Sequence, residues 1–247
     1  MTQIEGCVAL VTGGNRGVGL AIVEELLARG AAKVYAGART PADADAPGAE
    51  LVQLDITDPA QVAAAAAHCH DVTLLVNNAG YHANTRLVLT DDPEAARREM
   101  EVNYFGTLAM TRAFAPVLGR NGGGAIVNVL SVAAVVPAAF MGGYSTSKAA
   151  TWFLSAITRA ELAGQGTQVT SLVLGSVDTR MAAHVEGKKE DPRDIASRGL
   201  DAVEAGAQTF ATDKMAIDSM AAHQADPEGF ERLLGRLLHV TNLRAPG

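Results

Sequence analysis

A tyrosine and a lysine four residues apart are the strongest chemical signal in this sequence. Tyr144 and Lys148 open a run with helical character, and on a helix this spacing places both side chains on one face, one turn apart. An ammonium group beside a phenol favours the phenolate, so a group that titrates near about 10 in water becomes useful closer to neutrality. The pair is predicted to perform acid–base catalysis. The alternative is an ordinary helix start with a packed tyrosine and a solvated lysine.

A serine upstream of this pair supplies a second hydroxyl group. Ser131 follows an apolar run and precedes a loop of small residues, so its hydroxyl can reach the point at which Tyr144 acts. A carbonyl oxygen held there would receive two hydrogen-bond donors. The three residues together indicate chemistry on a carbonyl or alcohol group.

The start of the chain has the order strand, glycine loop, helix. Residues 8–11 are an apolar run typical of a buried strand, and they are followed by TGGNRGVG and an apolar stripe of helical spacing. Glycines let the backbone approach a pyrophosphate, and the helix start attracts its charge. The spacing is GxxxGxG, through Gly13, Gly17 and Gly19. Its position between strand and helix favours dinucleotide binding over ordinary turns.

The second predicted strand, residues 33–39, ends where the adenosine ribose of a dinucleotide should lie. An acidic residue there would bind a free 2′-hydroxyl, but the sequence has Ala38 and Arg39. Arg39 suits a 2′-phosphate, and Arg16 in the glycine loop offers a second positive charge. The sequence therefore predicts NADP(H) as cofactor; the alternative is two solvated surface arginines.

The rest of the chain alternates predicted strands with predicted helices. Strands are expected at 51–55, 72–76, 125–130 and 169–174, and helices at 59–68, 95–118 and 144–162. This alternation predicts an α/β fold, a Rossmann-type, doubly wound parallel sheet with helices on both faces. Each strand ends in small or polar residues, on the side where such sheets bind ligands.

Composition sets limits on the class of protein. The chain has 247 residues, 48% of them hydrophobic, and a net charge of −7 without a long basic run. These values predict one domain over 1–247 and argue against nucleic-acid or anionic-membrane partners. No targeting or spanning segment is apparent, so a cytoplasmic location is expected. Cys7 and Cys69 are expected to be unpaired, and the sequence 68–70, HCH, to be a helix end rather than a metal site.

With its motifs in this order, the sequence resembles the short-chain dehydrogenase/reductase family over roughly residues 5–180. The matching pieces are TGGNRGVG, Asp55, NNAG at 77–80, Asn103, Ser131, YSTSK at 144–148 and GSVDT at 175–179. Each motif alone is modest evidence, whereas their joint order is specific. The C-terminal part is less clear and looks like carbonyl-reductase-like relatives.

The resemblance implies an NAD(P)-dependent oxidoreductase and assigns roles to four residues. Tyr144 would give a proton to the substrate oxygen, Lys148 would lower the Tyr144 pKa and hold the nicotinamide ribose, and Ser131 would position the carbonyl. Asn103 would anchor a water molecule in a proton relay. The expected cofactor-binding residues are Gly13, Asn15, Arg16, Gly17, Val18, Gly19, Arg39, Asp55, Ile56, Asn77, Ala79, Gly80, Tyr144, Lys148, Gly175, Val177 and Thr179.

Two features depart from the family pattern. Leu174-Gly175 stands where the family usually has Pro-Gly, so the turn that carries Val177 and Thr179 is expected to be less rigid. The frequent Thr-Gly…Asp-Gly-Gly ending is absent. Instead a helix is expected from Pro192 to about Gly206, then a short strand at 209–212, with helical residues continuing beyond Leu238.

The substrate is expected to be a small carbonyl or alcohol with a hydrophobic or aromatic body. The predicted substrate-binding residues are Ser131, Ala133, Phe140, Tyr144 and Met181. The pocket candidates are mostly apolar, which disfavours a charged acid. A variable segment at about 180–247 is expected to hold a mobile substrate lid at 180–192.

Assembly and reaction class leave alternatives. The helices at 95–118 and 144–162 carry Met110, Phe114, Trp152, Phe153 and Leu154, apolar residues on more than one face, which predicts a homodimer or homotetramer. The leading hypothesis is an NADPH-dependent reductase of a ketone or aldehyde. The alternatives are an NAD-dependent alcohol dehydrogenase, a catalytically inactive cofactor-binding regulatory protein, and a lyase or epimerase, for which the chain has little room.

Overall fold

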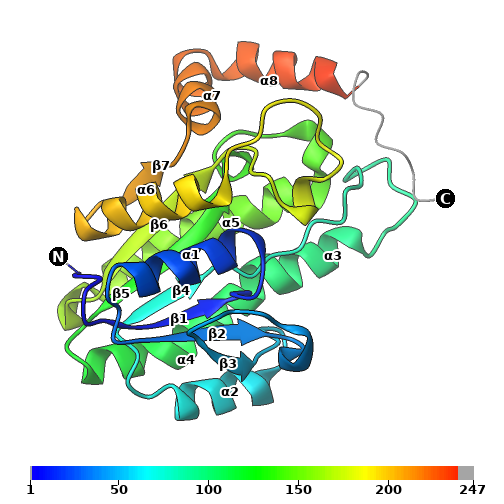
Figure 1. Cartoon of the computed structure of the whole chain (residues 1–247). Helices are drawn as coiled ribbons and strands as arrows, with labels where there is room; N and C mark the ends of the chain where they lie inside the picture. Colours follow the sequence, from blue (N-terminus) through cyan, green and yellow to red (C-terminus); the bar gives the residue numbers. More distant parts are fainter. Residues whose placement is uncertain (1, 239–247) are drawn as a thin grey trace.

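A parallel sheet is the centre of the molecule (Figure 1). The structure, a computed structural model, describes residues 2–238, and within them the sheet has seven strands in the order β3-β2-β1-β4-β5-β6-β7. The order reverses between β1 and β4, which confirms the predicted doubly wound, Rossmann-type sheet. The strands are β1 (Val8–Thr12), β2 (Lys33–Ala38), β3 (Glu50–Gln53), β4 (Leu74–Asn77), β5 (Ala125–Ser131), β6 (Gln168–Leu174) and β7 (Thr209–Ala211).

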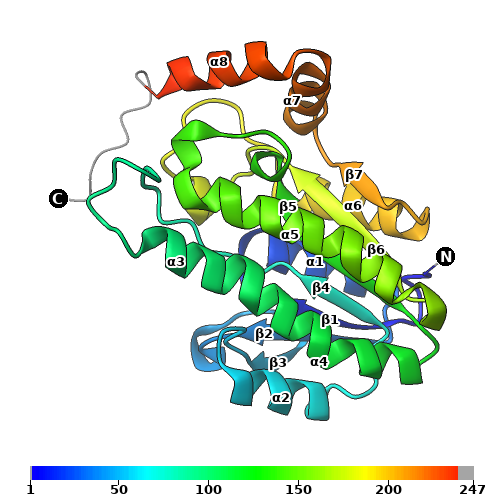
Figure 2. The ribbon, with the colours of Figure 1, turned by 180° about the vertical axis from the view of Figure 1, so that it is seen from behind.

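Helices cover both faces of this sheet (Figures 1 and 2). On β1, Ala9 and Val11 pack toward α1 (Gly17–Ala28) and α6 (Pro192–Glu204). Leu10 points the opposite way, into the cluster formed with α2 (Pro59–His68) and α4 (Thr107–Arg120). Successive side chains of a strand alternate between faces, so a continuous apolar run forms two cores. The polar strand ends are left at the carboxyl edge of the sheet.

The helical region predicted at 95–118 is interrupted by a wider turn. It consists of α3 (Ala95–Met100), a π-helical turn η2 (Glu101–Gly106) and α4. In the π-helical turn the Asn103 carbonyl accepts hydrogen bonds from Thr107 Oγ1 at 2.8 Å and from Thr151 Oγ1 at 2.9 Å. Two threonine side chains thus bind to this carbonyl of the widened turn. The sequence pattern predicts one continuous helix here. It does not reveal the π-helical turn, because that turn involves a hydrogen bond from Thr151, which lies far along the chain.

Most of the apolar residues that led to the oligomer prediction belong to the core. Met110 and Phe114 have no exposed surface, and Leu154 on α5 (Gly142–Glu161) is 7% exposed. Phe153 differs, because 68% of it is exposed. The reason is that three of these positions face the sheet or the neighbouring helix. The large apolar residues that are exposed in this helical region are Phe105, Phe153 and Ile157.

The C-terminal part adds two helices beyond the sheet. The expected helix and short strand after residue 191 are α6 and β7, and they are followed by α7 (Lys214–Ala225) and α8 (Pro227–Leu237). Figures 1 and 2 show α8 at the same end of the molecule as the loop that precedes α6, and α8 contacts the short helix η4 (Ala139–Met141). The predicted continuation beyond Leu238 lies outside the described residues.

The remaining predictions concern cysteines, metals and membranes. Cys7 and Cys69 are buried free thiols, as expected. His68 does end α2, and its Nε2 lies 2.5 Å from Glu50 Oε1. Within the described part of the chain no group of three or more metal-type ligands is assembled. Nor does any helix in residues 2–238 combine the length and apolar character that a membrane crossing requires.

Candidate active site

The helix α5 places Tyr144 and Lys148 together, as their spacing predicts. Tyr144 is 8% exposed and Lys148 is 6% exposed. The Lys148 Nζ lies 5.7 Å from the centre of the Tyr144 ring and donates a hydrogen bond to the Val129 carbonyl at 3.0 Å. Both groups therefore lie at the carboxyl end of β5, on the side of the sheet where open α/β folds bind ligands.

Ser131 reaches Tyr144 across the gap between β5 and α5. It is the last residue of β5, and its side chain hydrogen-bonds with the Tyr144 hydroxyl. The same oxygen accepts a hydrogen bond from the Ala133 backbone at 3.2 Å, which fixes the serine rotamer. The predicted pair of hydroxyl groups is thus assembled from two elements.

The protonation of this pair differs from the sequence prediction. Burial raises the pKa of Tyr144 to about 12, with Glu99 adding to the rise and the Ser131 hydrogen bond opposing it. Burial lowers the pKa of Lys148 to about 8. The expected lowering of the Tyr144 pKa is therefore wrong for the chain alone, because desolvation of the phenolate outweighs the opposing effects. At neutral pH the phenol holds its proton.

A buried polar network fixes α5 on the sheet. The Asn77 amide donates to Asn128 Oδ1 at 2.9 Å, and Asn128 donates to Ser155 Oγ at 2.8 Å. Ser155 in turn donates to the Thr151 carbonyl at 2.8 Å. These bonds join β4, β5 and α5. Asn77, predicted on the cofactor wall, has its side chain in this network, although its Oδ1 has no partner.

Asn103 lies beside the pair and holds the segment that follows β4. Its Nδ2 donates to the Tyr81 carbonyl and to Ser147 Oγ, both at 2.9 Å, and its Oδ1 accepts from the Tyr81 backbone at 2.8 Å. A Cβ atom on Gly80 would lie 3.3 Å from Asn103 Oδ1 and 3.6 Å from Lys148 Nζ. Gly80, Asn103 and Lys148 therefore meet, as predicted.

The glycine loop is packed closely against the segment at 77–80. A Cβ atom on Gly19 would lie only 2.1 Å from the Gly13 carbonyl oxygen, so this position requires glycine. Asn78 Nδ2 donates to the carbonyls of Thr12 at 3.0 Å and of Gly13 at 3.2 Å. These hydrogen bonds hold the glycine loop in a defined shape. Asn78 is therefore a positioning residue. It was not among the residues predicted to bind the cofactor, although it lies inside the NNAG motif.

The glycine loop also meets the segment after β6. Gly17 has a φ of +54°, and a Cβ atom on it would lie 3.2 Å from Thr179 Cγ2. The loop is open to solvent at Asn15 and Arg16 and begins a helix at Gly17. A narrow backbone cradle at a helix start fits a pyrophosphate group, so the residues present fit a dinucleotide.

Three arginines surround this cradle without acidic partners. Arg16, Arg39 and Arg180 make no ion pair with any residue in the described ranges. Partial desolvation, followed by the positive charges of Arg180 and Arg39, lowers the pKa of Arg16. The cluster therefore carries uncompensated positive charge. Arg180 was missed by the sequence reasoning, although it directly follows the GSVDT motif.

The turn after β6 is held by an aspartate from the C-terminal part. Asp213 is 2% exposed, and its Oδ2 accepts a hydrogen bond from the Gly175 backbone at 2.7 Å. Its Oδ1 accepts from the Ala216 backbone at 3.0 Å and so caps α7. The turn at Leu174-Gly175, which lacks the usual proline, is thus held in place by the Asp213 side chain.

The other predicted cofactor residues occupy varied environments. Asp55 Oδ1 accepts hydrogen bonds from the Thr57 backbone at 3.0 Å and from its hydroxyl at 2.7 Å. Ile56 and Val177 are each 6% exposed and join the two core clusters. Val18 and Ala79 are partly buried and pack against those same clusters. Their side chains mainly support the edge of the sheet.

The substrate side is made of small and apolar residues around Tyr144. Ala133, Ala138 and Tyr144 form a buried cluster, and Phe140 packs against it. The structure thus brings Ala133 and Phe140 to the tyrosine as predicted. Met181, in the short helix η6 (Arg180–Ala182), is 45% exposed and does not join this cluster.

The segment predicted to be a lid is a loop whose two ends are hydrogen-bonded to each other. The Asp178 backbone donates to the Glu190 carbonyl, and the Glu190 backbone donates to the Ser176 carbonyl, both at 2.9 Å. Lys189 Nζ crosses the loop to the Ala182 carbonyl at 3.3 Å. These contacts join the two ends of the segment between β6 and α6.

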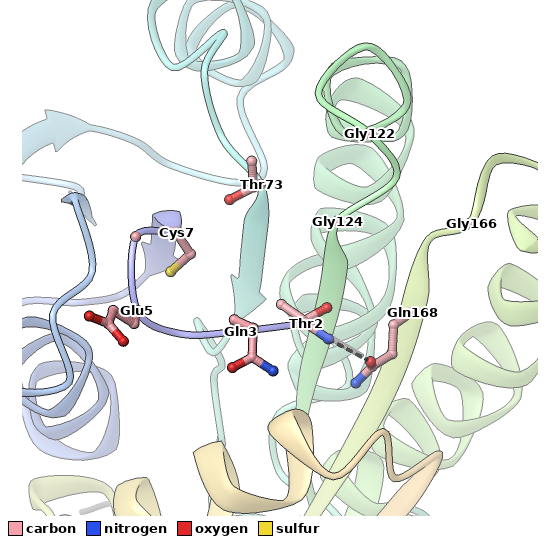
Figure 3. Close-up of a pocket in the computed structure, with 10 residues that line it drawn as sticks. Thr2, Gln3, Glu5, Cys7, Thr73, Gly122, Gly124, Gly166 and Gln168 are labelled. Carbon is pink, nitrogen blue, oxygen red and sulfur yellow. Dashed lines mark hydrogen bonds between the residues drawn. The ribbon is translucent and has the colours of Figure 1, made fainter.

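A separate surface depression lies at the other edge of the sheet (Figure 3). It has a volume of about 370 Å³ and is lined by Thr2, Gln3, Glu5, Gly6, Cys7, Thr73, Gly122, Gly124, Gly166 and Gln168. These residues lie before or at the start of β1, β4, β5 and β6, at the amino ends of the strands. Burial raises the pKa of the Cys7 thiol to about 11, so it is not a reactive thiolate. None of the predicted site residues lines this depression.

The geometry defines a dinucleotide-type α/β fold with a Tyr–Lys–Ser site at its carboxyl edge. The short chain dehydrogenase family matches residues 7–190, and the chain belongs to this family. A short chain dehydrogenase of Monascus purpureus is 32% identical over 223 residues, which are 83% of this chain and 74% of that protein. The galactitol 2-dehydrogenase (L-tagatose-forming) of Cereibacter sphaeroides is 33% identical over 76% of this chain and 78% of its own length.

Solved structures agree with this membership. The crystal structure of a short chain dehydrogenase from Burkholderia cenocepacia J2315 in complex with NADP is 45% identical and superposes with a TM-score of 0.90. The match covers 94% of this chain and 98% of that chain. A short-chain dehydrogenase from Streptomyces avermitilis is 26% identical, with a TM-score of 0.81 over 95% and 98% of the two chains. Both matches extend into the C-terminal part that the sequence motifs do not cover.

Proposed function

We propose that this oxidoreductase is an NADP(H)-dependent carbonyl reductase that converts a ketone or aldehyde into an alcohol. The observation that carries the proposal is the contact of Ser131 with the Tyr144 hydroxyl, next to Lys148 and beside the glycine loop. The hydroxyl groups of Tyr144 and Ser131 converge at this point, close to the glycine loop that fits a dinucleotide. A carbonyl oxygen placed between them would receive both hydrogen bonds.

The residues of this chain have separable tasks in such a reaction. A dinucleotide held at the glycine loop would supply the hydride to the carbonyl carbon. Tyr144 gives its proton to the carbonyl oxygen, which becomes the hydroxyl of the alcohol. Ser131 holds the same oxygen through a hydrogen bond. The raised pKa of Tyr144, about 12, keeps the phenol protonated at neutral pH, which favours reduction over alcohol oxidation in that range.

Lys148 and Asn103 support this proton transfer. The Lys148 ammonium is buried with one hydrogen bond, to Val129, so its two other N–H groups are left for the ribose of a cofactor and for water. Asn103 is fixed by Tyr81 and Ser147 at this point. We propose that it orders the water through which Tyr144 regains a proton.

The choice of NADP(H) rests on charge. Ala38 leaves the end of β2 without a carboxylate, and the pKa of Arg16 is lowered by partial desolvation and by the nearby charges of Arg180 and Arg39. Uncompensated arginines form charge-assisted hydrogen bonds with a phosphate group. The relative from Burkholderia cenocepacia was crystallised with NADP, which supports the same cofactor here.

The test is a spectrophotometric assay of NADPH consumption with a panel of aliphatic and aromatic ketones and aldehydes. A reductase consumes NADPH only when a carbonyl compound is present and forms one equivalent of alcohol. A regulatory protein that has kept only cofactor binding would bind NADPH and leave every carbonyl unchanged. That second result would overturn the proposal and favour the regulatory alternative.

We further propose that the chain is one domain that forms a homodimer or homotetramer. Phe105, Phe153 and Ile157 lie on the outer side of the helices between residues 101 and 161 and are 49%, 68% and 54% exposed. Exposed aromatic groups on neighbouring helices are typical of contacts between subunits. Light scattering at micromolar concentration tests this, and a monomer would contradict it.

A further inference from the structure

A histidine that none of the assigned roles uses lies directly beside the catalytic tyrosine. The centre of the His82 ring is 4.8 Å from the centre of the Tyr144 ring, and the planes are tilted by 49°. His82 Nε2 is buried and has no hydrogen-bond partner. A buried nitrogen without a partner is costly to a folded protein, so this atom indicates a function that packing alone does not explain.

The backbone on both sides of His82 is held in place. Tyr81 makes two backbone hydrogen bonds to the Asn103 side chain, at 2.8 and 2.9 Å. The Ala83 backbone donates to Glu99 Oε1 at 2.8 Å, and Glu99 is itself 2% exposed. The backbone that carries the imidazole is therefore held by two buried side chains, Glu99 and Asn103. Such support is expected of a residue that must hold a ligand in a defined position.

The segment predicted to be a lid also comes close to His82. The ring of His184, in the loop between β6 and α6, lies 5.8 Å from the His82 ring. His82 thus neighbours both Tyr144 and the loop between β6 and α6. A substrate bound at Tyr144 would therefore lie close to this imidazole.

The imidazole is neutral at physiological pH. Burial, and then the charge of His184, lowers the pKa of His82 to about 4. A neutral ring offers one donor and one acceptor nitrogen and no positive charge. It can therefore bind a hydroxyl or carbonyl oxygen, whereas it offers no charge to a carboxylate.

We propose that His82 is a specificity-determining residue whose Nε2 hydrogen-bonds with a second, neutral oxygen of the substrate, on the carbon next to the reacting carbonyl. This inference rests on the proposed reductase function and adds a substrate class to it. The site then prefers α-hydroxyketones and vicinal diketones over plain ketones of the same size. The apolar cluster of Ala133, Ala138 and Phe140 remains for the body of the substrate.

The experiment compares two matched substrates, 2-hydroxyacetophenone and acetophenone, in the NADPH assay. For the unaltered protein we expect a kcat/KM ratio of at least ten in favour of the hydroxyketone. His82→Phe keeps a ring against Tyr144 and removes both nitrogens. We expect it to lower kcat/KM for the hydroxyketone about tenfold, equivalent to about 1.4 kcal/mol, and to leave that for acetophenone within threefold.

Two further variants make the result decisive. His82→Gln keeps a hydrogen-bonding group and should recover part of the preference, so a poorly folding phenylalanine variant does not end the test. His70→Phe, at an exposed histidine after α2, is the matched control and should leave both substrates unchanged. Melting temperatures and NADPH affinities of all variants are measured alongside.

The outcomes separate this inference from the proposed function. Equal use of both ketones by the unaltered protein, or an equal loss for both in His82→Phe, would overturn the role of His82 and leave the reductase intact. If no carbonyl compound of the wider panel is reduced although NADPH binds, the proposed function and this inference both fail. A preference for the hydroxyketone that His82→Phe abolishes supports both.

Discussion

The cofactor side and the reaction side of this site use charge in opposite ways. Around the glycine loop, Arg16 and Arg39 are exposed, and they form with Arg180 a cluster that has no acidic partner among the described residues. Around Tyr144, each of the titratable groups with a perturbed pKa is shifted toward its neutral form. Burial raises the pKa of Tyr144 and of Glu99 and lowers the pKa of Lys148 and of His82.

The difference follows from what each region has to do. A phosphate group is bound by charges that remain charged, and solvent access keeps arginines protonated. Around Tyr144, burial destabilises the charged forms, so the phenol keeps its proton at neutral pH until an acceptor oxygen is placed beside it. Binding and chemistry should therefore respond to different mutations.

The largest expected effect is on turnover in Tyr144→Phe. The ring and its packing remain while the proton is lost, so kcat should fall by about 10²–10⁴-fold. The dissociation constant for NADPH should stay within threefold, because the phenol is one of many cofactor contacts. Steady-state kinetics and fluorescence titration measure the two quantities. A parallel loss of binding and turnover would break the separation between the two regions.

The next effect concerns cofactor choice. We expect the unaltered protein to prefer NADPH over NADH by about ten- to a thousand-fold in kcat/KM, since two charge-assisted contacts to the 2′-phosphate are each worth about 1.5–3 kcal/mol and are partly screened. Ala38→Asp combined with Arg39→Ala should weaken or invert this preference. Arg180→Gln is the comparison variant: it removes one positive charge of the same cluster without adding a carboxylate, so it should reduce the preference less than the double variant does. An unchanged ratio in the double variant would mean that Arg39 is a plain surface charge.

The third effect is a pH dependence assigned to Lys148. Its pKa is lowered to about 8, so the ammonium is present below about pH 8 and is lost above it. If that charge assists reduction, kcat/KM should fall up to tenfold per pH unit above this point. In Lys148→Ala the remaining activity and the NADPH affinity should both be lower, and the inflection near pH 8 should disappear. An inflection that persists in the variant would belong to another group.

The smallest effect is expected at Asp213. Asp213→Ala removes the hydrogen bond to Gly175 and the cap of α7, so stability should decrease by about 0.5–2 kcal/mol and NADPH should bind about three- to tenfold more weakly. Asp226→Ala is matched, because Asp226 caps α8 through Gly229 and has no hydrogen bond to the turn after β6 within residues 2–238. It should lower the melting temperature only. Equal cofactor affinity in both variants would exclude a positioning role for Asp213.

The sequence predicted the parts of this molecule that depend on local chemistry. The strand, glycine loop and helix order predicted β1 and α1, and the spacing of Tyr144 and Lys148 predicted a shared helix face. Parallel strands of alternating α/β segments place their carboxyl ends at one edge, so Ser131 could be assigned to the same edge from its position after β5.

The parts that were missed depend on contacts between distant segments. The π-helical turn at Asn103 involves Thr151, and the turn at Gly175 is held by Asp213. The pKa of Tyr144 is governed by burial, which sequence spacing does not reveal. His82 follows the NNAG motif closely in the sequence, but only the fold places it against Tyr144.

The most direct test follows the hydride itself. NADPH that carries deuterium on the reactive face of the nicotinamide C4 is incubated with the protein and a ketone that it consumes, and the alcohol is analysed by mass spectrometry and NMR. The account predicts one deuterium per product molecule, on the carbinol carbon, for the unaltered protein, and at least a hundredfold slower formation of the same labelled alcohol in Tyr144→Phe. Bound NADPH whose deuterium never appears in an alcohol, with either face labelled, would contradict it.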